Sequence, residues 1–233
     1  MFSPAFTKTS SCKECPVKSS AAAALRPEEI DLVNLNSSEA EFRKGDIILH
    51  EGSMISHIIY LKSGIVKEYR KGPGDTEQIL QIVKRQSYLG LPSLFGDRIN
   101  HYSYTALEDI LVCYIDLGVF NHLIRKNGNF AYEILVLVSR DSLNNFQRFM
   151  NQSQKRTYGR VADALLYFSM MIYESNTFTI PFTIQELGAL TGISRESATR
   201  VLTRFRDEKI LRITGRRIDI INPELLQKIS KNG

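Results

Sequence analysis

The stretch GISRESATRVLTRF, residues 192–205, holds two patterns that a single α-helix separates onto opposite faces. Its apolar side chains recur every three or four residues and so share one face: Ala198, Val201, Leu202 and Phe205. Arginine, carboxylate and hydroxyl groups gather on the other face: Arg195, Glu196, Thr199, Arg200 and Thr203. The first face suits a protein core. The second is either solvated surface or a set of groups that hydrogen-bond base edges in a DNA major groove.

The residues on either side of this stretch predict a winged helix. Thr183 and Glu186 have the spacing of a capping box, so a short helix begins there and ends at Gly192. Ser194 is a favourable N-cap for the next helix, and the intervening turn has the length that a helix-turn-helix uses. Alternating apolar and polar residues on both sides of Gly215 predict a β-hairpin after the second helix.

In this motif the second helix enters the major groove with its N-terminal residues leading. We therefore expect contacts to base edges from Arg195, Glu196, Thr199 and Arg200. Contacts to phosphates, which set register without specifying sequence, are expected from Thr183, Gln185, Thr203, Arg212, Arg216 and Arg217. The alternative is that these are solvated charges on a winged helix that binds another protein and never touches DNA.

The distribution of charge also indicates a basic module at the C-terminal end. The chain of 233 residues has a formal charge of +5, and its 43% apolar and 24% charged residues are typical of a globular protein. From Gln154 onward it has 13 Lys and Arg against 8 Asp and Glu, whereas residues 1–153 balance at 17 and 17. This asymmetry favours a basic module that binds a polyanion, joined to a neutral module that has another function.

The length favours two modest domains rather than one large domain. No apolar run is long enough to cross a bilayer, and the first residues lack the apolar core of a secretory signal. We therefore expect a cytoplasmic protein that does not bind membranes.

The hydrophobic period changes along the chain. Residues 42–118 are typical of many short strands with glycine-containing turns, which predicts an antiparallel barrel or jelly roll. From Phe130 to about Gln152 the pattern predicts one long helix, with a seam of Leu135, Val138, Ser142, Asn145 and Phe149. That helix packs either on its own barrel or against the same helix of a second chain. A second helix is predicted from about Gln154 to Glu174.

Taken in order, these motifs resemble the Crp/Fnr family of bacterial transcription regulators. KGDIILHEGSMISHIIYLKSGIVKEY (44–69) is similar to the early strands of the family's cyclic-nucleotide-binding-type barrel, and LGLPSLFGD (89–97) to its ligand-pocket segment. GISRESATRVLTRF is similar to its recognition helix. The resemblance implies a homodimeric regulator, not an enzyme, that binds a palindromic DNA operator and RNA polymerase and responds to a small molecule, a gas or a redox signal.

With this resemblance, the expected fold is α+β, and four parts can be assigned. They are an N-terminal segment (1–27), an antiparallel β-barrel or jelly-roll sensor domain (28–128), a long dimerisation helix (129–153) and a winged helix-turn-helix domain (154–233).

The expected effector pocket departs from that of the family's cyclic-AMP binders. Those proteins carry a Gly-Glu-Leu segment and an Arg-Ser pair that grips the cyclic phosphate. Here the matching residues are Gly90, Leu91 and Pro92 and, for the pair, Asn100 and His101. Without that carboxylate and guanidinium, the charge-assisted hydrogen bonds that select cyclic AMP are missing. We expect a different, unidentified effector.

The three cysteines raise the question of a redox or metal centre. Cys12 and Cys15 form a Cys-x-x-Cys pair, and Cys113 resembles the distant cysteine of oxygen-sensing Fnr-like members, which hold a [4Fe-4S] cluster with four thiolates. The remaining ligand of that pattern would fall at Ala21, so a cluster would need a noncysteine ligand or an open iron. Two other interpretations are reversible chemistry of an exposed thiol pair, and a mobile tail with an unrelated core cysteine.

The four histidines show no metal-ligand spacing: His50, His57, His101 and His122. One histidine can ligate haem in gas sensors of the family, and His101 is the candidate because it falls in the expected pocket. A thiol oxidoreductase using Cys12 and Cys15 is a further alternative. Such pairs normally adjoin a βαβ unit and a helix start, which this part of the sequence does not predict.

Overall fold

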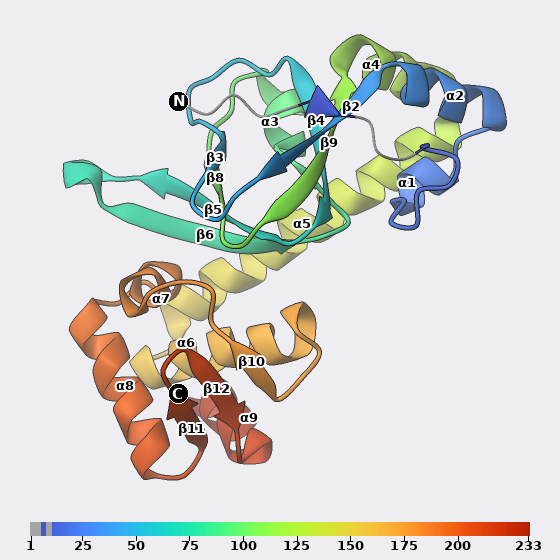
Figure 1. Cartoon of the computed structure of the whole chain (residues 1–233). Helices are drawn as coiled ribbons and strands as arrows, with labels where there is room; N and C mark the ends of the chain where they lie inside the picture. The colour runs from blue at the N-terminus through green and yellow to red at the C-terminus, as the bar shows by residue number, and fades with distance from the viewer. Residues whose placement is uncertain (1–5, 8–10) are drawn as a thin grey trace. The chain divides into compact units, whose positions relative to one another are not determined.

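The computed structural model describes residues 6–7 and 11–233 (Figure 1). The chain divides into two compact units, one made of the residues up to 70 together with 81–143, the other of residues 71–80 and 144–233. In the part of the chain that the structure describes, no helix combines the length and apolarity that a membrane span requires.

Two β-sheets make up most of the first unit; only Lys71 of β5 and residues 77–80 of β6 are assigned to the second. The strands pair antiparallel where β2 meets β9 and β5 meets β8. One sheet has the order β1 (Phe6–Thr7), β2 (Ser37–Phe42), β9 (Ile110–Asp116), β4 (His57–Ser63) and β7 (Ser87–Leu89). The other has the order β3 (Ile47–Leu49), β8 (Ser103–Ala106), β5 (Ile65–Lys71) and β6 (Glu77–Lys84). A short 3-10 helix, Pro73–Asp75, joins β5 to β6. The antiparallel sandwich expected from the sequence is confirmed.

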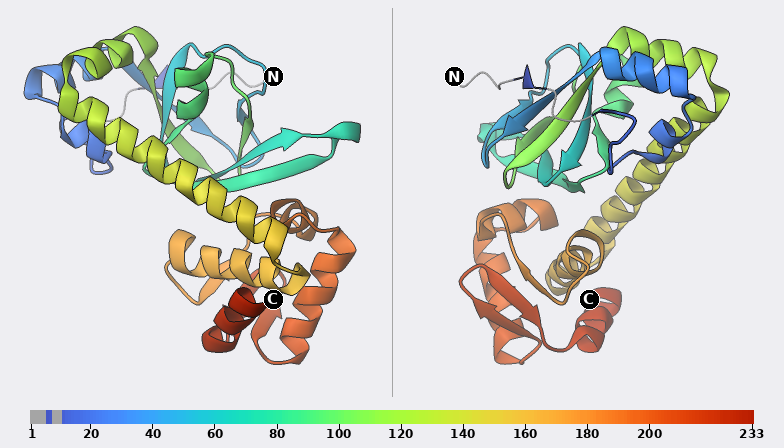
Figure 2. Two further views of the ribbon diagram at one scale, coloured as in Figure 1. Left: turned by 180° about the vertical axis from the view of Figure 1, so that it is seen from behind. Right: turned by 45° about the vertical axis from the view of Figure 1, so that its right-hand side comes forward.

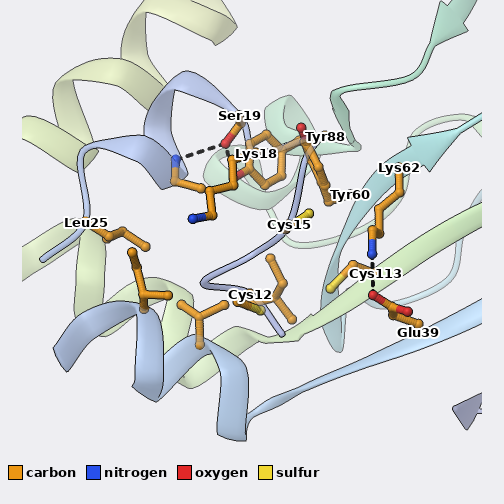
Figure 3. A pocket seen from close by; sticks show the side chains of 14 residues that line it. Cys12, Cys15, Lys18, Ser19, Leu25, Glu39, Tyr60, Lys62, Tyr88 and Cys113 are labelled. Carbon is orange, nitrogen blue, oxygen red and sulfur yellow. Dashed lines mark hydrogen bonds and ion pairs between the residues drawn. The ribbon is translucent and has the colours of Figure 1, made fainter. Parts of the chain in front are cut away.

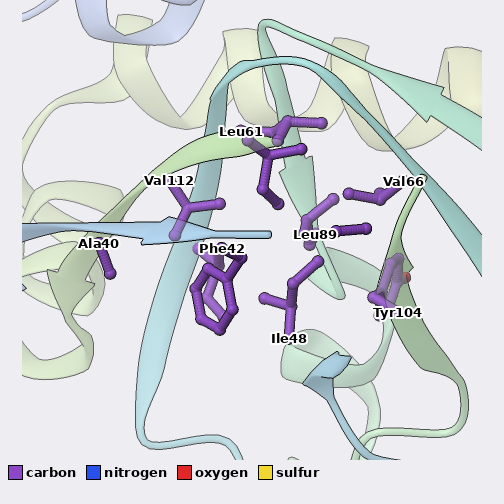
Figure 4. Packing of buried hydrophobic residues seen from close by; sticks show 11 residues of the cluster. Ala40, Phe42, Ile48, Leu61, Val66, Leu89, Tyr104 and Val112 are labelled. Carbon is purple, nitrogen blue, oxygen red and sulfur yellow. The ribbon is translucent and has the colours of Figure 1, made fainter. Parts of the chain in front are cut away.

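The core of this unit lies between the two sheets, because alternate residues of each strand point inward. Ile59 and Leu61 of β4 face this core, together with Val66 of β5 and Tyr104 of β8 (Figure 4). Their neighbours Ile58 and Tyr60 lie on the opposite face of the same sheet. That second face is therefore free to pack against helices.

Helices cover the outer face of the β2–β9–β4 sheet and form a second buried cluster with it. They are α1 (Ser20–Ala23), α2 (Pro27–Leu35), α3 (Leu91–Gly96), α4 (Leu117–Lys126) and the start of α5 (Gly128–Gln154). Ile58 and Ile115 of the sheet meet Phe120 of α4 and Phe130 of α5 in this cluster. The sequence did not predict α1 to α4, since each is shorter than the window over which helical periodicity is readable.

The long helix α5 runs without a break, as Figure 2 shows, and confirms the helix predicted from Phe130 to about Gln152. Of the predicted seam, four side chains are exposed: Leu135, Ser142, Asn145 and Phe149. Val138 packs against the helical cluster of the first unit. The large apolar side chains left exposed along α5 are Tyr132, Leu135, Leu143, Phe146, Phe149 and Met150.

The second unit has the order of elements expected of a winged helix, with two additions. Its elements are α6 (Thr157–Tyr167), a π-helical turn (Phe168–Ile172), β10 (Thr177–Thr179), α7 (Ile184–Thr191), α8 (Arg195–Asp207), β11 (Leu211–Thr214), β12 (Arg217–Ile220) and α9 (Pro223–Asn232). The strand β10 pairs with β12, and α9 packs on α6. Neither was predicted.

The helix expected over about 154–174 is placed differently in the structure. Gln154 ends α5, and the new helix begins only at Thr157. Its regular α-helical part stops at Tyr167, where the π-helical turn begins. Continuous helical periodicity does not reveal such changes of hydrogen-bond register, because the apolar spacing stays nearly the same.

Candidate DNA-binding surface and thiol pocket

Local hydrogen bonds define the two helices of the helix-turn-helix. The Thr183 hydroxyl accepts from the Glu186 backbone N–H at 3.2 Å, and the Glu186 carboxylate accepts from the Thr183 N–H at 2.8 Å, which is the predicted capping box. Gly192 ends α7 in the left-handed region, at φ 67°. Ser194 then caps α8 by accepting from the Ser197 N–H at 3.2 Å.

The turn between the helices is tight because α7 carries a glycine where it meets the turn. A Cβ atom added at Gly188 would lie 2.7 Å from the carbonyl oxygen of Ile193. The same two residues are joined by a hydrogen bond of 3.0 Å from the Ile193 N–H to the Gly188 carbonyl. The angle between α7 and α8 therefore depends on the missing side chain.

The helix α8 separates its two faces as the sequence predicts. Its buried side chains are Ala198, Val201, Leu202 and Phe205. Its exposed side chains include all four residues predicted to contact bases: Arg195, Glu196, Thr199 and Arg200. Arg200 donates to the Ser197 hydroxyl at 2.9 Å, so its guanidinium is held along the outer surface of the helix.

The acidic member of this surface stays ionised. Hydrogen bonds from its own backbone N–H and from Ser194 lower the pKa of Glu196, and the nearby Arg195 and Arg200 lower it further. An ionised carboxylate is a hydrogen-bond acceptor only, which suits the amino group of cytosine. The exposed face thus offers donors and one acceptor side by side.

The wing carries the predicted phosphate-contacting arginines on the β11–β12 hairpin, all exposed. Arg212 lies opposite Asp219 in the strand register, and Arg217 donates to the Asp219 carboxylate at 3.2 Å. Arg216 lies in the turn next to Gly215. The other three predicted contacts, Thr183, Gln185 and Thr203, are also exposed. Of the wing arginines, Arg217 is the one whose guanidinium forms an ion pair with the Asp219 carboxylate.

The residues expected to line an effector pocket in the barrel separate into buried and exposed sets. Gly90, Leu91 and Asn100 are buried, and Asn100 donates to the Ser53 hydroxyl at 3.0 Å. Pro92 and His101 are exposed. All four histidines of the chain are exposed, and His101 interacts at 2.9 Å with a neighbouring surface carboxylate, that of Asp97.

The three cysteines meet in one pocket, which the sequence did not predict (Figure 3). Cys12 and Cys15 come from the N-terminal segment and Cys113 from β9 on the outer face of the sheet. An ion pair between Lys62 and Glu39 lies beside Cys113 and is itself buried. Apolar side chains of the N-terminal helices close the rest of the pocket.

Hydrogen bonds attach the N-terminal segment to the sheet and to α2. Tyr60 donates to the Val17 carbonyl at 2.6 Å, and the hydroxyls of Tyr88 and Ser19 are 2.8 Å apart. The Cys12 backbone N–H donates to the Asn34 side chain at 3.0 Å. From residue 11 onward this segment therefore packs on its surroundings, and the thiols are partly buried rather than exposed.

The thiol pocket does not fit a four-thiolate cluster. Ala21, which falls at the spacing of the missing ligand, is fully buried among apolar side chains. Burial raises the pKa of Cys113 to about 12. Within residues 11–233, no three or more His, Cys, Asp and Glu side chains are arranged to hold a metal ion.

Comparison with known proteins agrees with this architecture. Residues 39–127 match the cyclic nucleotide-binding domain, and residues 159–229 match the Crp-like helix-turn-helix domain. The chain is 25% identical to the fumarate and nitrate reduction regulatory protein of Vibrio cholerae, over 94% of this chain and 90% of that protein. It is 23% identical to the transcriptional activator protein Anr of Pseudomonas protegens, over 91% and 89%.

The fold has counterparts among solved structures. That of FixK2 from Bradyrhizobium japonicum superposes with a TM-score of 0.76 at 18% identity, covering 83% of this chain and 96% of that one. The two domain matches follow the expected order, and the relatives align along nearly the whole length. The exposed arginine-bearing face on α8 agrees with them. The chain belongs to the Crp/Fnr family of DNA-binding transcription regulators.

Proposed function

We propose that the chain acts as a homodimer that binds a palindromic DNA operator through α8. The observation that carries this proposal is the exposed face of α8, where Arg195, Glu196, Thr199 and Arg200 stand opposite a fully apolar buried face. Arg200 reads guanine through two hydrogen bonds and Glu196 accepts from cytosine. The wing arginines, with Thr183, Gln185 and Thr203, hold phosphates and set the register.

The dimer forms along α5, within the proposed dimerisation helix 129–153. Support comes from side chains such as Leu135, Leu143, Phe146 and Phe149, which leave an apolar face exposed on a helix of 27 residues. Two such helices packed together bury this face. A twofold axis then presents two α8 helices to half-sites one helical turn apart.

The barrel domain, proposed to span 28–128, receives the signal. The residues at the expected pocket support an effector other than cyclic AMP, since buried Asn100 is a neutral amide and its hydroxyl partner is Ser53. Binding of an effector alters DNA affinity by changing how the α5 helices pack. As in the family at large, the bound regulator contacts RNA polymerase, and the protein works in the cytoplasm, where its DNA lies.

The decisive test is selection of duplexes from a random library by the full-length chain, followed by titration of the selected duplex. The expected result is a palindrome whose half-sites are centred about 10 base pairs apart, bound with steep salt dependence. Binding of random duplex alone, equal to that of the selected sequence at every salt concentration, contradicts the proposed readout. Absence of any DNA binding at low salt favours a winged helix that contacts only protein.

A further inference from the structure

The thiol pocket brings two cysteines that are about 100 residues apart in the sequence to the same serine. The Cys12 sulfur lies 3.7 Å from the Ser37 hydroxyl oxygen. Ser37 also partly offsets the rise in the pKa of Cys113, which lies on the neighbouring strand β9. Ser37 is therefore the neighbour that Cys12 and Cys113 have in common, in a pocket whose remaining wall is largely apolar.

The third cysteine takes a different position in the pocket. Of the other two thiols, it is Cys12 whose charge affects the pKa of Cys113. Cys15 and Cys113 both act on the pKa values of Tyr60 and Lys62. Figure 3 shows Cys113 beside Lys62 and Glu39, and Cys15 nearer to the two tyrosines. The pair with a shared partner is thus Cys12 and Cys113, not the adjacent Cys-x-x-Cys pair.

We propose that Cys12 and Cys113 form an oxidisable dithiol, which a hydroperoxide converts to a disulfide. The inference deepens the proposed function, because it names the chemistry by which a redox signal reaches the regulator. It also explains how this chain uses its cysteines when they do not fit a four-thiolate cluster.

The two thiols have different roles in the reaction. Cys12 reacts first as a thiolate: its sulfur attacks one oxygen of the hydroperoxide, the O–O bond breaks, and an alcohol leaves with the thiol proton. The product is a sulfenic acid at Cys12. The Cys113 sulfur then attacks the Cys12 sulfur, the S–O bond breaks, and water leaves with the Cys113 proton. Two electrons pass from the thiols to the peroxide.

The order of these steps follows from the environments of the two sulfur atoms. Burial raises the pKa of Cys113 to about 12, so this group remains a thiol at neutral pH and is a poor first nucleophile. Cys12 lies in the N-terminal segment, and its side chain, like that of Cys113, is partly accessible. Cys113 lines the same pocket and is the thiol that resolves the sulfenic acid.

The disulfide has a route to the dimerisation helix. It would join the N-terminal segment to β9, and both elements pack in the buried cluster that contains the start of α5. Ala21 of α1 and Leu25, which follows that helix, share this cluster with Phe130 and Ile134 of α5. Any shift of the N-terminal segment on oxidation therefore alters the packing at the first turns of α5.

The test uses the full-length chain, reduced and free of oxygen, treated with tert-butyl hydroperoxide and mapped by mass spectrometry without reduction. The expected product is a linked peptide containing Cys12 and Cys113, in the wild type and in Cys15→Ser. It is lost in Cys12→Ser and in Cys113→Ser. The wild-type map decides the question by itself if a variant does not fold.

A linkage between Cys12 and Cys15, or oxidation without any Cys12–Cys113 linkage, overturns the inference. A second measurement is the rate of linkage: Ser37→Ala slows it, whereas Ser38→Ala, one residue along the same strand, does not. Equal rates in the two variants contradict the role of Ser37. DNA binding by the reduced chain is measured separately, so that loss of the disulfide and loss of the proposed function are distinguishable outcomes.

Discussion

Asn127 donates a hydrogen bond of 2.6 Å to the carboxylate of Glu29, joining the N-terminal helix α2 to the beginning of α5. The same side chain accepts from the Phe130 N–H at 3.0 Å and so caps α5. Glu29 also accepts from Arg26, through the backbone N–H and the guanidinium. One buried amide thus couples the helix cap of α5 to the segment that carries Cys12.

Two substitutions at Asn127 separate its functions. Asn127→Ala removes the cap and leaves the Glu29 carboxylate without one donor, and is expected to lower the free energy of unfolding by about 1 to 3 kcal/mol. Asn127→Asp keeps an acceptor for the cap but places two carboxylates together. Urea denaturation at pH 7 checks both; wild-type stability in Asn127→Asp would contradict the coupling.

The Glu29 carboxylate predicts acid sensitivity of the first unit. Its pKa is lowered from 4.5 to about 2, first by the hydrogen bond from Arg26, then by Asn127. The folded pKa lies below the unfolded one, so the stabilisation is complete above about pH 4.5 and is lost as the pH falls towards 2. Urea titrations across this range should show a shallower loss of stability in Glu29→Gln than in the wild type. If the stability of Glu29→Gln and of the wild type fell equally with pH, Glu29 would not be the cause of the acid sensitivity.

Base readout and phosphate contact predict different losses. Arg200→Ala should reduce discrimination between the selected operator and a variant half-site by about 1 to 3 kcal/mol, and Arg200→Lys should restore the charge but not the discrimination. Arg216→Ala should weaken binding to all sequences about equally and flatten the salt dependence. Fluorescence anisotropy at several salt concentrations measures both effects. Unchanged discrimination in Arg200→Ala would disprove its role in readout.

The exposed apolar face of α5 predicts where a charge blocks dimerisation. Phe146→Glu introduces a carboxylate into the proposed interface and should weaken association by about 3 kcal/mol or more, roughly 100-fold in Kd. Asn144 is exposed on the opposite side of the same helix, so Asn144→Glu is the matched control. Sedimentation equilibrium distinguishes them. Equal dissociation in both variants would mean that a different surface forms the dimer.

The glycine at the turn predicts a packing defect without any change of charge. In Gly188→Ala, the new methyl group would lie 2.7 Å from the Ile193 carbonyl oxygen, so α7 and α8 must move apart. The expected cost is about 1 to 3 kcal/mol, together with weaker DNA binding. At Gly128 an added Cβ meets nothing within 4 Å, so Gly128→Ala should be nearly neutral. Thermal unfolding of the two variants provides the comparison.

Features set by neighbours in the sequence were predictable. The Thr183–Glu186 capping box, the Ser194 cap and the two faces of α8 all depend on residues within about one or two helical turns of each other. The same holds for the length of α5. The short helices α1 to α4 were missed because each is shorter than the window over which helical periodicity is readable. The π-helical turn after Tyr167 was missed because its apolar spacing resembles that of α6.

The sequence by itself therefore determined the winged helix, its arginine-bearing surface and the order of the two domains, since hydrogen bonds and periodicities between near neighbours carry that information. Only the tertiary structure decided that Cys12 and Cys113 line one pocket, and that Asn127 reaches Glu29. These contacts join residues far apart in the chain, and their geometry follows from how strands pair and helices cover a sheet. No local pattern of side chains specifies that arrangement.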